Sequence, residues 1–143
     1  MIMSELKFQS QIIDDAKAFN KNTFGLKMNN RFISGVPDLM LKVPGYDVIL
    51  IEAKLIRPTS KGVIHVNTTD IQRAMMRLMY RAGFRVEVWV AVGIEDKHYL
   101  VRTTYNVTSL NIGDCELIGR IRGSKWPIEY LLKNRVDTSH LDA

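Results

Sequence analysis

The sequence has almost no cysteine and no long apolar stretch, and both absences exclude classes of protein. Cys115 is its only cysteine, so no internal disulfide can form, and its three scattered histidines give no zinc-binding pattern. No apolar run approaches the roughly 20 residues of a membrane helix, and the first residues lack the pattern of a secretory signal peptide. We therefore expect a cytoplasmic protein with no membrane partner.

What the chain does contain suits one globular domain. Its 143 residues are a typical domain length, and 46% of them are apolar, which is enough for a buried core. The formal net charge of +5 favours an anionic partner without identifying it. Apolar periodicity and turn residues predict helices at about 5–19, 70–82 and 127–134, and strands at about 23–33, 36–43, 47–55, 85–93, 98–102 and 115–122. This order predicts an α/β fold, with a mixed sheet flanked by helices.

Three charged residues, Asp38, Glu52 and Lys54, interrupt two of the predicted strands. Burying such charges is costly unless they are paired or bind a metal. Glu52 and Lys54 are two residues apart, so on a strand they point to the same face. Carboxylates hold a hard divalent cation, which can polarise a phosphate and activate water. A lysine can stabilise the developing charge. The set predicts metal-dependent phosphodiester hydrolysis, and the alternative is a buried ion-pair network between neighbouring strands.

The turn between these two strands decides whether the two acids can meet. A two-residue loop, 44–45, would place Asp38 opposite Ile51 and put the acids on opposite faces of the sheet. A three-residue loop, 44–46, places Asp38 opposite Glu52, with Cβ atoms about 5 Å apart. We therefore predict an odd-length loop, or a bulge with the same effect.

Pro37-Asp38 followed by Glu52-Ala53-Lys54 resembles the PD-(D/E)xK nuclease superfamily. The run 35–39, a glutamate in the first helix, and a helix that carries Gln72 and ends at 81–83 make the resemblance closest to the virus-type replication-repair nuclease branch, which includes phage junction-resolving enzymes. The resemblance covers roughly residues 4–93. It implies a single nuclease domain with a restriction-endonuclease-like core, in the order α-β-β-β-α-β. That core spans about 4–103, with an extension over about 104–143.

The resemblance also implies site residues and a cofactor. Asp38, Glu52 and the Ala53 carbonyl would hold Mg²⁺, with Mn²⁺ able to substitute, and Lys54 would contact the attacking water or the scissile phosphate. A glutamine on the later helix, Gln72, would complete the site, and a first-helix glutamate, Glu5, would lie beside the metal. Helical spacing places Glu5 on the same face as Gln9, Ile12, Ala16 and Phe19, although a glutamate at a helix start is often only a favourable dipole partner.

The substrate expectation rests on the resemblance as well. It implies a homodimer that cleaves Holliday or other branched DNA in a bacterial or phage-infected cell. Flaps, nicks and linear duplex are alternative targets, and a catalytically silent nucleic-acid-binding module is an alternative of another class. Basic side chains are candidates for phosphate contact, with solvated surface as the open alternative. They are Lys27, Arg31, Arg57, Lys61, Arg73 and Arg77.

Two further helical patterns give predictions that a structure can test. In the helix at 70–82, we expect a core stripe of Ile71, Ala74, Met75, Leu78 and Ala82, and a partner surface at Met76, Met79 and Tyr80. Near the end of the chain, basic residues beside Trp126 could bind nucleic acid by charge and stacking. A tryptophan at a helix start is more often a packing anchor, and we prefer that interpretation.

Overall fold

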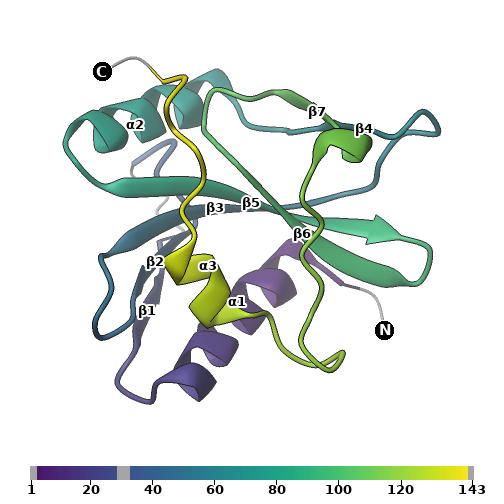
Figure 1. Ribbon diagram of the computed structural model, residues 1–143. Coiled ribbons are helices and arrows are strands. Elements are labelled where there is room, and N and C mark those ends of the chain that lie inside the picture. Colours follow the sequence, from purple (N-terminus) through teal and green to yellow (C-terminus); the bar gives the residue numbers. More distant parts are fainter. Residues whose placement is uncertain (1–2, 29–32, 142–143) are drawn as a thin grey trace.

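One mixed sheet of five strands, in the order β1-β2-β3-β5-β6, organises the protein (Figure 1). The computed structural model describes residues 3–28 and 33–141. Strands β3 and β5 are parallel, and the other neighbours in the sheet are antiparallel. The elements are α1 Glu5–Phe19, β1 Phe24–Lys27, β2 Leu39–Lys42, β3 Ile49–Ile56, β4 Val63–His65, α2 Asp70–Arg81, β5 Arg85–Ile94, β6 Lys97–Thr103, β7 Ser109–Asn111, a 3-10 turn η1 Ile112–Asp114 and α3 Ile128–Lys133. The predicted mixed sheet flanked by helices is confirmed.

Side-chain caps explain where the two longer helices begin. The Ser4 hydroxyl accepts a hydrogen bond from the Lys7 N–H, at 3.1 Å, and starts α1. Thr69 and Gln72 form a reciprocal capping box at the start of α2. Both predicted helix starts are therefore confirmed. No helix within the described residues is long and apolar enough to cross a membrane.

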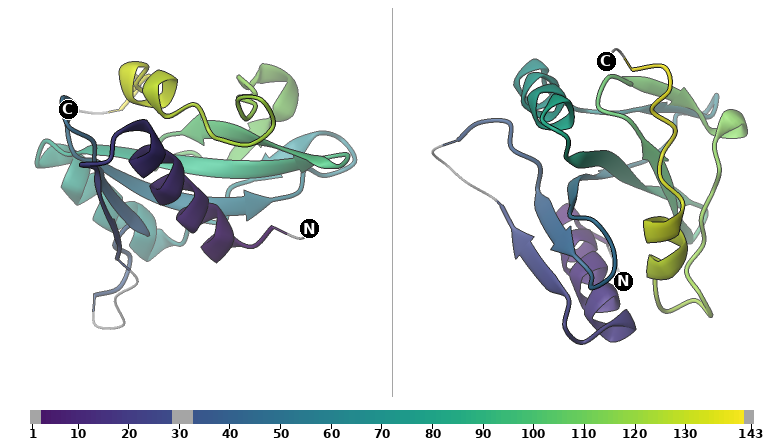
Figure 2. Two further views of the ribbon diagram at one scale, coloured as in Figure 1. Left: turned by 90° about the horizontal axis from the view of Figure 1, so that it is seen from below. Right: turned by 60° about the vertical axis from the view of Figure 1, so that its left-hand side comes forward.

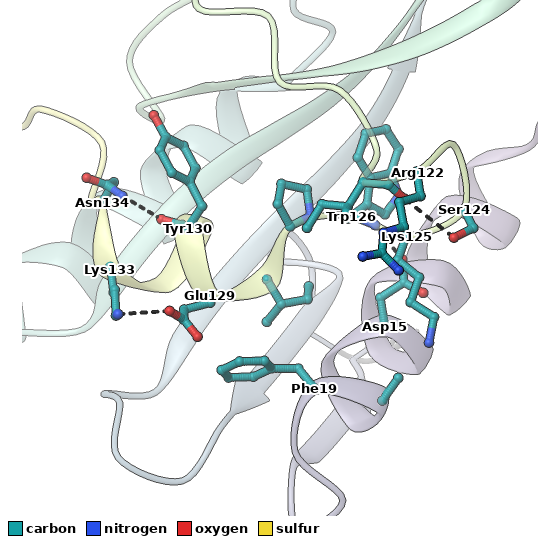
Figure 3. A pocket seen from close by; sticks show the side chains of 14 residues that line it. Asp15, Phe19, Arg122, Ser124, Lys125, Trp126, Glu129, Tyr130, Lys133 and Asn134 are labelled. Atoms are coloured by element: carbon teal, nitrogen blue, oxygen red, sulfur yellow. Dashed lines mark hydrogen bonds and ion pairs between the residues drawn. The ribbon is translucent and has the colours of Figure 1, made fainter.

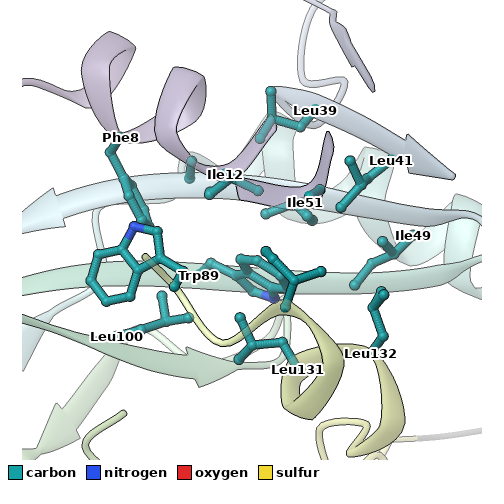
Figure 4. Close-up of a cluster of buried hydrophobic side chains, with 14 of the residues drawn as sticks. Phe8, Ile12, Leu39, Leu41, Ile49, Ile51, Trp89, Leu100, Leu131 and Leu132 are labelled. Carbon is teal, nitrogen blue, oxygen red and sulfur yellow. The ribbon is translucent and has the colours of Figure 1, made fainter. Parts of the chain in front are cut away.

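The sheet has an apolar core on each face. On one face, α1 and α3 pack against odd-numbered residues of β2, β3 and β5 and against Leu100 of β6, as Figure 4 shows. On the other face, α2 and the small β4–β7 sheet pack against even-numbered residues of β2, β3 and β5 and against Val101 of β6, and Figure 2 shows α2 apart from α1 and α3. Trp126 is 2% exposed and meets Phe8 edge to face, with ring centroids 5.8 Å apart. The preferred role for Trp126, a packing anchor, is confirmed.

The predicted core stripe of α2 is wrong. Ile71 and Leu78 are 60% and 64% exposed, whereas Met76 is fully buried. Met79 and Tyr80, predicted to form a partner surface, pack against the core with Met76. Helix α2 carries two apolar stripes, and helical spacing alone does not decide which one faces the sheet. The stripe that is buried is the one that continues from Gln72, through i+4 and i+7, so the packing also turns Gln72 inward.

Several other predictions need correction. Phe19 is 42% exposed, and Phe8 is instead the phenylalanine of α1 that lies in the hydrophobic core. The connection 56–68 contains a short strand, β4. The region 115–122 forms no strand; it contributes only isolated bridges of Ile118 to Leu100 and of Ile121 to Lys125. Part of the predicted strand 23–33 lies outside the described residues, and the described part is a strand only over β1.

Candidate functional site

The register of β2 and β3 brings the two acids together. Leu39 pairs with Ile51, and continuing this antiparallel register places Asp38 opposite Glu52. At the other end, the last pair is Leu41 with Ile49, so an odd number of residues, 42–48, lies between the paired positions, with a turn closed by a 3.0 Å hydrogen bond from Tyr46 N–H to the Val43 carbonyl. The predicted odd-length loop is confirmed. Asp38, Glu52 and Lys54 therefore share the face of the sheet that α2 covers.

Strand β3 has an unpaired edge next to these residues. Because β2 begins at Leu39, no strand in the described part of the chain pairs with that edge beyond Ile51. Two carboxylates accept hydrogen bonds from the backbone N–H groups of this edge instead. Asp38 Oδ2 accepts from the Ala53 N–H at 2.9 Å, and Glu5 Oε2 accepts from the Leu55 N–H at 3.2 Å. Since the N–H and C=O of one strand residue point to the same edge, the Ala53 carbonyl also points toward the acids.

Glu52 is buried with only one of its oxygens in use. Its side chain is 1% exposed, and its Oε2 lies 3.3 Å from Lys54 Nζ and 3.1 Å from Gln72 Nε2. Its Oε1 has no hydrogen-bond partner among the described residues. Burial raises the pKa of Glu52 to about 7, the neighbouring Asp38 carboxylate adds to the rise, and Lys54 opposes it. Burial also raises the pKa of Asp38, against the hydrogen bond from Ala53.

The cap of α2 fixes the amide orientation of Gln72. The Thr69 N–H donates to Gln72 Oε1 at 2.9 Å, which leaves Nε2 free to donate to Glu52. The sequence suggested Thr69 only as a helix cap, but its main chain also sets which end of the Gln72 amide meets the acid. This arrangement joins the start of α2 to the middle of β3 through the hydrogen bond between Gln72 and Glu52.

Gly35 brings the chain that leads to Asp38 against the first turn of α2. Its φ is +85°, and a Cβ built on it would lie 2.6 Å from the Ile71 carbonyl oxygen. We expect Gly35→Ala to lower the free energy of unfolding by at least about 2 kcal/mol, because left-handed backbone strain adds to a clash with main chain. Gly45→Ala is the matched control, since Gly45 has φ +89° and nothing within 4 Å of its built Cβ.

Denaturant unfolding of both variants measures the difference. Gly45→Ala should show the backbone strain alone, and Gly35→Ala should be clearly less stable than it. Equal losses in the two variants would mean that the contact of Gly35 with Ile71 relaxes freely and does not position α2.

The acids offer oxygen ligands to a metal ion from two neighbouring side chains. The described residues contain no group of three or more His, Cys, Asp or Glu side chains that is ready to hold one. Asp38 and Glu52 are neighbours, but the Glu5 carboxylate is turned to the Leu55 N–H. The donor set is nevertheless all oxygen, as a hard divalent cation prefers, and the buried Glu52 Oε1 is a free acceptor. The residues present therefore fit such an ion at Asp38 and Glu52.

The remaining predicted residues fall outside this group. Lys27 donates to Ser10 Oγ at 2.7 Å, and Arg73 is held by Asp70 and Thr68 at the start of α2. Arg57, Lys61 and Arg77 are exposed, and Arg31 lies outside the described residues. Gln9 is 3% exposed, and its Oε1 has no partner among the described residues.

A groove of about 800 Å³ lies elsewhere on the molecule, between the end of α1, the 121–127 segment and α3 (Figure 3). None of the acids at the candidate site lines it.

A scan against models of known protein families and a search of curated proteins both found no match for this chain.

Proposed function

We propose that the protein is a metal-dependent endonuclease of the PD-(D/E)xK superfamily that hydrolyses phosphodiester bonds in branched DNA, with Holliday junctions as the favoured substrate and a homodimer as the working form. The observation that carries the proposal is Glu52, a buried carboxylate beside Asp38 with one oxygen free of partners. A purely structural ion pair with Lys54 gives that oxygen no role. The order α1, β1, β2, β3, α2, β5 supports a restriction-endonuclease-like fold.

Each residue of the site has a role in this proposal. Mg²⁺, or Mn²⁺ in its place, would be held by Asp38, Glu52 and the Ala53 carbonyl, with Glu5 joining them once its carboxylate turns from the Leu55 N–H. When bound, such an ion polarises the phosphate and lowers the pKa of a bound water. Lys54 supplies positive charge where charge develops on the phosphate oxygens during attack by water. No covalent intermediate with the protein is required.

The neighbouring groups hold these side chains in place. The Ala53 N–H fixes Asp38, and the Gln72 amide fixes the Oε2 side of Glu52, leaving Oε1 open. The pKa of Glu52, at about 7, means that this carboxylate is only partly ionised at neutral pH without a cation. Binding of the cation is therefore expected to tighten as pH rises through that range, because the ion competes with the proton for Glu52.

Cleavage of labelled DNA with Mg²⁺ tests the proposal. Substrates are a four-way junction, a flap, a nicked duplex, a linear duplex and a single strand. We expect paired nicks in the junction, and a loss of at least roughly 10²-fold in Lys54→Ala, because a charge that acts in the transition state is removed. Lys42→Ala is the matched control. Lys42 lies on β2, on the face of the sheet that α2 covers, and donates to the Val43 and Tyr46 carbonyls.

The outcomes separate the alternatives. Equal cleavage of linear or single-stranded DNA would keep the chemistry and overturn the junction assignment. Binding of DNA without any cleavage, in both Mg²⁺ and Mn²⁺, would favour the silent nucleic-acid-binding module. A Lys54→Ala protein that cleaves like the wild type would remove Lys54 from the reaction.

A further inference from the structure

A basic pocket lies on the other side of α1 from the candidate site. It encloses about 530 Å³ between the first half of α1, the turn from β5 to β6, and the loop 119–123. Lys7, Lys97 and Arg120 line it, with His98, and Asp96 is the one acid among the described residues that line it. The pocket therefore carries three formal positive charges and one negative charge, with histidine neutral.

No ion pair within the described residues engages the three cations of this pocket, although the Asp15 carboxylate, which accepts from the Trp126 N–H, lies within reach of the charge of Arg120. None of the ion pairs among residues 3–28 and 33–141 includes Lys7, Lys97 or Arg120. By contrast, the cations buried deepest in the fold, Arg85 and Arg102, are both paired with Glu87. Like charges gathered in a concave surface favour an anion that binds between them.

Arg120 is held in place before any ligand arrives. Its guanidinium carbon lies 5.5 Å from the centroid of the buried Trp126 ring, and its Nη2 donates to the Ser124 carbonyl. Its Nε is buried and has no partner in the described part of the chain. A guanidinium fixed on an aromatic face loses little conformational freedom on binding, and its planar donors match phosphate oxygens.

The first turns of α1 connect the pocket to the candidate site. In α1, Glu5 bonds to β3, while Lys7, about 200° further around the helix, faces the pocket. The start of α1 and the β5–β6 turn lie at the same end of the molecule in both Figure 1 and Figure 2. A helix with its side chains is about 10–12 Å across, or about three nucleotides at 3.4 Å each along one strand.

We infer that this pocket binds a backbone phosphate of the same DNA molecule that the candidate site cleaves, a few nucleotides from the scissile bond. The inference rests on the proposed nuclease function and adds a second contact to it. Arg120 is one of the basic residues beside Trp126 that the sequence offered for nucleic-acid binding, whereas Lys27, Arg57, Lys61, Arg73 and Arg77 do not line the pocket. Contacts of this kind set register and affinity without touching the reacting atoms.

Binding of a labelled four-way junction in EDTA, followed over about 50 to 200 mM salt, tests the inference. The double variant Lys7→Ala/Lys97→Ala should bind about tenfold more weakly, and its log–log salt slope should be shallower by about 1 to 2, one for each lost phosphate contact. The matched control is Lys17→Ala/Lys21→Ala, which removes the same charge at the opposite end of α1.

Cleavage at saturating DNA with Mg²⁺ separates this pocket from the catalytic site. The double variant should keep a maximal rate within about twofold of the wild type, since the pocket does not contact the scissile phosphate. If the double variant matches the control in affinity and salt slope, the inference is wrong while the nuclease proposal stands. If the wild-type protein neither binds nor cleaves DNA of any shape, both are wrong.

Discussion

Asp38→Asn and Glu52→Gln should each lower DNA cleavage by at least roughly 10³-fold and still give a folded protein. Each change removes a carboxylate charge and keeps the shape of the side chain. Asp38 and Glu52 are the two acids that share one face of the sheet at the unpaired edge of β3. Single-turnover cleavage with Mg²⁺ measures the loss, and circular dichroism checks the fold.

Although Glu52→Gln should lose cleavage, we expect the same variant to gain stability. In the wild type, the pKa of Glu52 is about 7 when folded, against its ordinary 4.5. The folded state therefore binds the proton more tightly, and stability is lost as pH rises from about 4.5 to about 7. That difference, at about 1.4 kcal/mol per pH unit, is on the order of 3 kcal/mol. Glutamine cannot ionise, so the metal-free variant should be more stable than the wild type at pH 8.

Denaturant unfolding in EDTA at pH 5 and pH 8 measures this effect. The wild type should lose more stability between the two values than Glu52→Gln does. Glu129→Gln is the control, because Glu129 is 54% exposed and pairs with Lys133 on the surface. Added Mg²⁺ should stabilise the wild type and not Glu52→Gln. If the stability of Glu52→Gln depends on pH as that of the wild type does, the folded state does not favour the protonated form of Glu52.

Simple periodicity was enough to predict the meeting of Asp38 and Glu52. Side chains alternate along a strand, so the parity of one loop decides whether two acids share a face. The connection between the paired residues Leu41 and Ile49 has the required odd length. The capped start of α2 could also be predicted from the sequence, because a threonine followed three residues later by a glutamine is a local signal for a helix start.

Other features could not be predicted because they depend on distant contacts. Helix α2 offers two apolar stripes, and the choice between them is made by the sheet and by the approach of Gly35 to Ile71. The Glu5 carboxylate reaches the backbone of Leu55, 50 residues away. No local pattern predicts that β3 leaves a free edge there, since this depends on where β2 begins.

The most important residue that the sequence patterns did not reveal is Glu87, another buried carboxylate, which is 2% exposed. On a strand, Arg85 and Glu87 in alternate positions look like a solvated face. They are instead buried, because Arg85 donates to the carbonyls of Leu131 and Leu132 at the end of α3, 46 and 47 residues away. This segment of the chain covers what would otherwise be a polar surface of the sheet.

Glu87→Gln should therefore lower the free energy of unfolding by about 3–5 kcal/mol, the usual loss when one member of a buried charge pair is removed. Both of its oxygens are in use. Oε1 accepts from Trp89 Nε1 at 2.9 Å, and Oε2 accepts from Arg85 Nε at 2.8 Å and from the Val136 N–H at 3.3 Å. An amide in its place would leave Arg85 buried without its counter-charge, beside an –NH₂ group that repels it.

Glu52→Gln is the natural comparison, since both variants replace a buried glutamate on a central strand by its amide. Glu52 has a free oxygen and a raised pKa, whereas every oxygen of Glu87 has a donor. Denaturant unfolding in EDTA at pH 8 should thus move the two variants in opposite directions from the wild type, with Glu87→Gln keeping cleavage at temperatures where it remains folded. Equal destabilisation of the two would mean that the orphaned oxygen of Glu52 is no sign of a functional acid, and that both glutamates serve only to hold the sheet together.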